Sequence, residues 1–132
     1  MVLALSEKIE QIIRGNDIDI TRTVNGIPSG QTITDGWFTV LQATNPFTQL
    51  YEKHITSTLV SGQGQIEDTG AGDGIGIVRF EITAANTLTM AGGTADVPLA
   101  HKYAVQVKTS AGKIFECEQG VMDCVEQIVI SA

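Results

Sequence analysis

Few residues of this chain belong to types that carry out catalysis, and their spacing does not bring them together. The two histidines, His54 and His101, lie far apart in the chain, and each is expected to be a surface or partly buried imidazole rather than a general base. A serine nucleophile would need an exposed, strained turn, and the Gly-x-Ser-x-Gly pattern that supplies one does not occur. The sequence therefore predicts no catalytic residues and no enzyme.

Metal and cofactor chemistry has equally little support. Cys117 and Cys124 lack the Cys-x-x-Cys spacing of a zinc site, and two buried thiols without a disulfide are the simplest interpretation. Asp68 and Asp73, in the glycine-rich segment 67–76, could offer oxygens to a calcium ion. The segment lacks the alternating acidic pattern of a calcium loop, so a flexible connection between strands is expected. We predict no metal and no cofactor.

The charge balance excludes two classes of partner. Fifteen acidic residues against eight basic ones give a net charge of −7, which repels both nucleic-acid phosphate and an anionic membrane surface. No segment approaches the roughly 20 apolar residues of a membrane helix. The first residues also lack the basic start of a signal peptide. These features predict a protein of the cytoplasm, or of a particle assembled there.

Short apolar runs that alternate with polar residues, bounded by Gly, Asn, Asp or Ser, predict strands along most of the chain. At 132 residues the chain fits one domain, and the absence of long amphipathic patterns argues against a parallel α/β sheet. We expect seven to nine short strands in a two-sheet antiparallel sandwich. The clearest predicted strands are 17–24, 36–42, 53–60, 75–83, 103–109 and 113–120.

Some parts of this plan are less regular. Residues 1–13 are expected to form an N-terminal arm that orders on assembly, ending in a weak edge strand over 8–14, and residues 14–132 to form the sandwich. A change of phase predicts a β-bulge near Gly120. Glu116 and Glu118, two positions apart, are expected on one solvated strand face.

Trp37 is the most informative aromatic residue. If Phe38 and Val40 face the core, Trp37 lies on the outer face, where tryptophan is typical of protein interfaces. With the opposite parity Trp37 would be a core tryptophan, and the sequence leaves both alternatives open. Further interface candidates are the apolar residues of the arm, namely Leu3, Leu5, Ile9 and Ile12.

Several segments resemble the immunoglobulin-like domains of tailed-bacteriophage baseplate and tail proteins, typified by the N-terminal domain of upper baseplate proteins. The similarity begins at IIRGNDIDITRTV and ITDGWFTVLQ and continues through GDGIGIVRFEITAANTLTM and YAVQVKTSAGKIFECEQG, from about residue 14 to residue 120. The positions that match its turns and strands are Arg14, Gly15, Asn16, Ile18, Ile20, Gly36, Phe38, Thr39, Val40, Tyr103, Gln106, Val107, Lys108, Gly112, Lys113 and Gly120.

The resemblance implies an immunoglobulin-like β-sandwich and a role in a virion. A structural component of the tail or baseplate, such as an assembly or adaptor protein present in several copies or as a homo-oligomer, is the expected function. A decoration protein on the phage head is the alternative within the same class. A carbohydrate-binding module for host attachment is the alternative from another class, although aromatic residues are only 5% of the chain.

Overall fold

The computed structural model describes the backbone of residues 4–44, 46–94 and 96–126, and the side chains of these ranges from residue 12 onward. This part of the chain forms eight strands and one short helix. In chain order they are β1 (Ala4–Ile13), β2 (Ile18–Val24), β3 (Ile33–Leu41), β4 (Gln49–Ile55), β5 (Gly64–Asp68), β6 (Gly76–Ile82), α1 (Ala84–Thr87), β7 (Leu99–Thr109) and β8 (Ile114–Val125).

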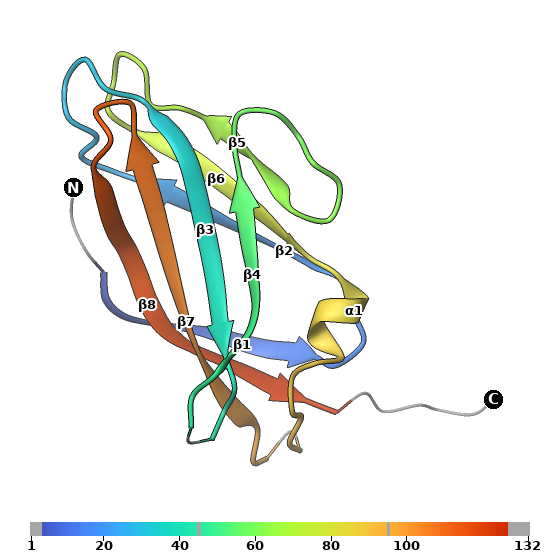
Figure 1. Ribbon diagram of the computed structural model, residues 1–132. Helices are drawn as coiled ribbons and strands as arrows, with labels where there is room; N and C mark the ends of the chain where they lie inside the picture. Colours follow the sequence, from blue (N-terminus) through green and yellow to red (C-terminus); the bar gives the residue numbers. More distant parts are fainter. Residues whose placement is uncertain (1–3, 45, 95, 127–132) are drawn as a thin grey trace.

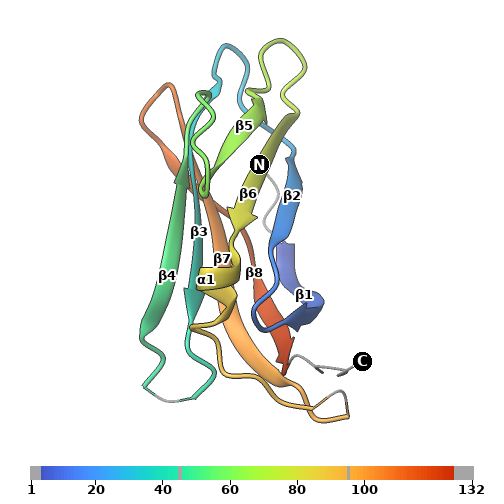
Figure 2. The ribbon, with the colours of Figure 1, turned by 90° about the vertical axis from the view of Figure 1, so that its right-hand side faces the viewer.

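The strands form two layers that pack face to face (Figures 1 and 2). One sheet has five strands in the order β1-β8-β7-β3-β4, and the other has three in the order β2-β6-β5. Neighbouring strands are antiparallel except β1 and β8, which run parallel. The strands β2, β6 and β5 occupy the places of strands B, E and D of an immunoglobulin domain, and β8, β7, β3 and β4 those of G, F, C and C′. The predicted immunoglobulin-like sandwich is confirmed.

The core lies between the two sheets and is built from the predicted alternation. In β6 every second residue is buried, which places Val78, Phe80 and Ile82 inside, and β7 buries Tyr103, Val105 and Val107 in the same way. Phe38 of β3 is fully buried at the centre, with its ring centroid 5.4 Å from those of both Phe80 and Tyr103. Because most other core residues are aliphatic, these three rings supply much of the buried apolar volume.

The N-terminal segment is the first difference from the sequence-based plan. Residues 4–13 were predicted to belong to an arm, but their backbone is strand β1, which pairs with β8 from Ala4 opposite Glu118 to Ile13 opposite Val125. The predicted edge strand over 8–14 is therefore correct in kind and too short. Parallel pairing at a sheet edge gives no short-range sequence signal, which explains the error.

The region between β3 and β6 differs in two further ways. The strand predicted over 53–60 is displaced, because β4 spans Gln49–Ile55 and Leu59 lies in the following turn with 53% of its surface exposed. The glycine-rich segment 67–76, predicted to be a flexible connection, begins with the last two residues of β5 (Gly64–Asp68). The loop after β5 is fixed by backbone hydrogen bonds, including Ile27 N to Gly74 O at 3.0 Å and Ile33 N to Thr69 O at 2.9 Å.

A β-bulge interrupts β8 at Cys117 rather than near Gly120. Gln106 of β7 pairs with Glu116, and the preceding Val105 pairs with Glu118, so Cys117 is the extra residue. An extra residue reverses the alternation of side chains beyond it. Glu116 therefore points to solvent while Glu118 points into the sandwich, which corrects the prediction that both occupy one solvated face.

Candidate functional site

Trp37 lies on the outer face of the five-stranded sheet. The structure therefore excludes the alternative in which Trp37 is a core tryptophan. Its neighbours Phe38 and Val40 are fully buried, so the side chain of Trp37 points away from the core and is half-buried. The outer face, defined as the outward side chains of β8, β7, β3 and β4, is turned toward the viewer in Figure 1, where no described element crosses it. Trp37 stands near its middle, on β3, between β7 and β4.

The Trp37 side chain is held by a stacked histidine. The rings of Trp37 and His54 have centroids 5.2 Å apart and planes only 4° from parallel. The two residues are direct cross-strand partners of β3 and β4, and such pairs stabilise a sheet most when both are aromatic. The imidazole of His54 is in turn held by Asp35, whose Oδ2 lies 2.8 Å from His54 Nε2. Trp37, His54 and Asp35 thus form one connected group, named here the Trp37 group.

The Trp37 group has a measurable electrostatic signature. The hydrogen bond with His54 is the main cause that lowers the pKa of Asp35 below its ordinary value, and Lys108 adds a smaller contribution. We expect His54→Ala to return the Asp35 pKa toward that ordinary value, as measured by carboxyl-carbon NMR titration. A carboxylate whose pKa is lower in the folded than in the unfolded state stabilises the fold at a pH above its unfolded pKa. This stabilisation is lost as the pH falls through the folded pKa. The variant should therefore show less loss of stability in acid from this carboxylate.

The control for this titration is Thr39→Ala, which changes a neighbouring outer-face residue whose hydroxyl donates to Glu52 rather than to Asp35. The Asp35 pKa should be the same in this variant as in the wild type. An Asp35 titration that is unaltered in His54→Ala would contradict the described hydrogen bond.

Charged residues flank the Trp37 group in an ordered way. In the row of Trp37, the residues opposite one another across the strands are His54, Trp37, Gln106 and Glu116, from β4 to β8. In the neighbouring row Asp35 of β3 lies opposite Lys108 of β7. The outer face therefore has a tryptophan, a residue type enriched at protein interfaces, among side chains of both charge signs.

The other sequence-predicted interface residues do not join this face. Ile12 is 1% exposed and belongs to the core, which corrects its assignment to an exposed contact surface. Its side chain is buried because the end of β1 pairs with β8 opposite Cys124. Leu5 and Ile9 are in β1, where the structure describes only the backbone, and Leu3 lies outside the described residues.

The histidines and cysteines occupy different environments. His54 is exposed, as expected, whereas His101 is completely buried, with its ring nitrogens 3.2 Å from Leu41 O and 2.9 Å from Ala91 O. Cys117 and Cys124 both lie on β8 and are not joined by a disulfide. Burial raises the pKa of the Cys117 thiol to about 11, so it stays protonated and weakly nucleophilic at neutral pH.

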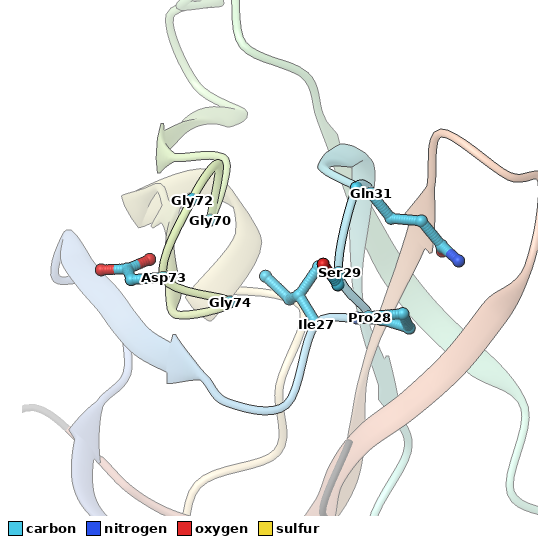
Figure 3. Close-up of a pocket in the computed structure, with 9 residues that line it drawn as sticks. Ile27, Pro28, Ser29, Gln31, Gly70, Gly72, Asp73 and Gly74 are labelled. Carbon is cyan, nitrogen blue, oxygen red and sulfur yellow. The ribbon is translucent and has the colours of Figure 1, made fainter.

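A hollow of about 340 Å³ lies between the β2–β3 and β5–β6 loops, at one end of the sandwich (Figure 3). Its only charged lining residue is Asp73, whose carboxylate points away from Ile27 in Figure 3 and accepts a hydrogen bond from Ile75 N at 3.0 Å. Asp68 likewise accepts one from Gly70 N at 2.8 Å. Within the described ranges, no group of three or more His, Cys, Asp or Glu side chains is placed to hold a metal ion. Both aspartates therefore stabilise turns.

One cluster was missed by sequence reasoning. Glu118, turned inward by the bulge, accepts hydrogen bonds from Arg22 Nε at 2.9 and 3.0 Å and from the Tyr103 hydroxyl. This cluster joins β2 of one sheet to β7 and β8 of the other. The change of phase along β8 was its sequence signal, but the phase alone does not locate the extra residue.

Comparisons with known proteins add little to this description. No protein-family model matches the chain, and no curated protein matches its sequence. Among solved structures, the chain is similar to the extracellular domain of the voltage-gated sodium channel β4 subunit, with a TM-score of 0.41, 6% identity, and 97% of this chain and 99% of that chain covered. A second is the RIG-5 IG1 homodimer, with a TM-score of 0.30, 14% identity and coverage of 93% and 90%. Likenesses this distant carry no argument about function.

The described residues also include no helix long and apolar enough to cross a membrane.

Proposed function

We propose that this chain is a non-enzymatic structural protein of a tailed-bacteriophage particle, acting through protein–protein contacts as an assembly or adaptor component of the tail or baseplate. The observation that supports a contact role most directly is the stacked Trp37–His54 pair on the open outer face of the five-stranded sheet. The assignment to a phage tail rests on the sequence resemblance of residues 14–120. Assembly would take place in the bacterial cytoplasm, with neither nucleic acid nor membrane as a partner.

The Trp37 group is well suited to a contact surface. Tryptophan is enriched among the few residues that carry most of the binding energy of an interface, particularly where its ring is already held in place. The stack with His54 and the hydrogen bond from His54 to Asp35 provide that support before any partner arrives. Binding therefore immobilises little additional side-chain freedom at this position.

The two alternative functions, a head decoration protein and a carbohydrate-binding module, require different surfaces. A decoration protein on the phage head would use the same kind of contact surface, so only its location in the particle separates it from a tail component. A carbohydrate site would use several aromatic rings as open platforms, whereas the Trp37 ring leaves a single face open because the other is stacked on His54. The geometry favours a protein partner.

The contact role is tested by Trp37→Ala. We expect the variant to fold, because the side chain lies on the outer face, and its incorporation into particles to fall at least about tenfold, as for an interface residue that contributes about 2 kcal/mol. Incorporation is measured by quantitative immunoblotting of purified particles. Gold-labelled antibodies in electron micrographs then distinguish tail from head.

The control is Leu59→Ala, which removes an exposed apolar side chain in the β4–β5 turn, outside the outer face. It should leave incorporation unchanged. Normal incorporation of a folded Trp37→Ala variant would refute a contact role for this face, and absence of the wild-type chain from particles would refute the virion assignment.

A further inference from the structure

The pattern of charges on the outer face has a property that single residues do not reveal. Asp35 on β3 and Lys108 on β7 are cross-strand partners of opposite charge. In the row of Trp37, His54 lies on β4 and Glu116 on β8. These are the two strands that flank the central pair β3 and β7, so the two residues are equally far from the line between β3 and β7. Asp35 and Lys108 therefore occupy mirror positions about this line, as do His54 and Glu116, and the members of each pair are chemically complementary.

The geometry points to a second copy of this chain as the occupant of the outer face, related by a two-fold axis that runs parallel to the strands between β3 and β7. This inference rests on the proposed contact role and names the partner. A rotation about that axis lays β3 of one copy over β7 of the other at the same height. Such an interface is isologous, so each contact occurs twice.

The two-fold axis brings complementary groups together in each central row. Asp35 faces Lys108 of the second copy, and His54 faces Glu116 of the second copy. Packed sheets rotate by about 30° relative to each other, which displaces such groups by only a few ångströms this near the axis, within reach of long side chains. Opposite charges across an interface fix its register and suppress other arrangements.

The side chains at the centre of the face fit the same arrangement. Trp37 would lie over Gln106 of the second copy, next to Ala104, which has the smallest side chain among the outward residues named here. Thr39 lies opposite Ala104 in the sheet, so the row beside Trp37 has short side chains at these two positions. In both copies this leaves room for the two indole rings. A bulky aromatic side chain beside a row of small residues allows the close packing that interface cores require.

The competing face-to-face arrangement is disfavoured by its charges. A two-fold axis that runs across the strands keeps each strand over itself and reverses the order of rows. If the axis passes between the Trp37 and Thr39 rows, Lys108 faces Lys102 of the second copy, and if it passes through the Trp37 row, Glu116 faces itself. Like charges placed opposite one another cost several kcal/mol, which disfavours both of these placements relative to the axis parallel to the strands.

The test uses two charge reversals and sedimentation equilibrium of the full chain. The wild type should show a reversible monomer–dimer equilibrium with a Kd of roughly 10–500 µM, as expected for a small and largely polar face. Asp35→Lys alone places cations opposite cations, and Lys108→Asp alone places anions opposite anions. Each should weaken self-association at least about tenfold. An equimolar mixture of the two variants should form a heterodimer, because each contact between positions 35 and 108 of the two chains then joins a lysine to an aspartate.

Lys113→Asp is the matched control, since it makes the same charge change in the exposed β7–β8 turn outside the outer face, and it should leave the Kd unchanged. Circular dichroism confirms that each variant keeps its strands. A wild type that remains monomeric at about 1 mM, or a mixture of variants that fails to associate, overturns the self-association. If Trp37→Ala nevertheless lowers incorporation into particles, the face binds a different virion protein, and the proposed function stands without this inference.

Discussion

Replacing Gly64 by alanine is expected to destabilise the fold by about 4 kcal/mol, more than other single changes of one methyl group in this chain. An added Cβ would lie 2.0 Å from the carbonyl oxygen of Arg79 and 3.0 Å from Phe80 Cα, and neither backbone atom can move without separating β5 from β6. Gly64 also has a φ of +122°, which alanine adopts only with strain. Overpacking and strain together give this magnitude. In thermal unfolding it corresponds to a Tm lower by roughly 12 °C.

The control that separates clash from backbone strain is Gly72→Ala. Gly72 also has a positive φ, +94°, but an added Cβ would have no heavy atom within 4 Å apart from its chain neighbours. We expect a cost of only about 1–2 kcal/mol, the strain alone. Equal losses of Tm in the two variants would show that β5 does not pack against β6 as described.

The alternating strands could be predicted because they have one buried and one exposed face. In β6, Val78, Phe80 and Ile82 alternate with residues that meet solvent, and no other register buries all three. The two layers of the sandwich follow from this rule, because each sheet has to bury one of its faces. The fold class was therefore within reach of the sequence.

Trp37 shows where alternation stops being decisive. Both faces of β3 have large apolar side chains there, so sequence alone allowed either parity. The structure resolves it because Phe38 meets Phe80 and Tyr103 in the centre of the core, a position that a single strand cannot reveal. The proposed contact site was thus predicted as a residue but not as a surface, since His54 and Asp35 join it only through pairing between strands.

The features that could not be predicted depend on long-range pairing. The segment of β5 has only one buried apolar residue, Ile66, and is a strand because β6 offers it an open edge. In the same way, the bulge at Cys117 is set by which residues of β7 and β8 find one another. No local preference distinguishes Glu116 from Glu118, although one is exposed and the other buried.

Glu118→Ala is therefore expected to destabilise the protein by about 2–4 kcal/mol, whereas Glu116→Ala should stay within about 0.5 kcal/mol of the wild type. Removing the carboxylate leaves the Arg22 guanidinium and the Tyr103 hydroxyl without their shared acceptor between the two sheets. The cost lies toward the lower part of the range for a broken buried pair, because 31% of the Arg22 side chain remains exposed to water. Urea denaturation measures both free energies of unfolding.

A double-mutant cycle with Arg22→Ala tests whether this energy belongs to the pair. Once Arg22 is absent, no cation is left unpaired, and Glu118→Ala should cost at least about 1 kcal/mol less than in the wild type. Glu118→Gln keeps an acceptor for Tyr103 but loses the charge, so its stability should fall between wild type and Glu118→Ala. Equal effects of Glu116→Ala and Glu118→Ala would mean that β8 continues without its bulge, and both carboxylates would then share the solvated face that simple alternation predicts.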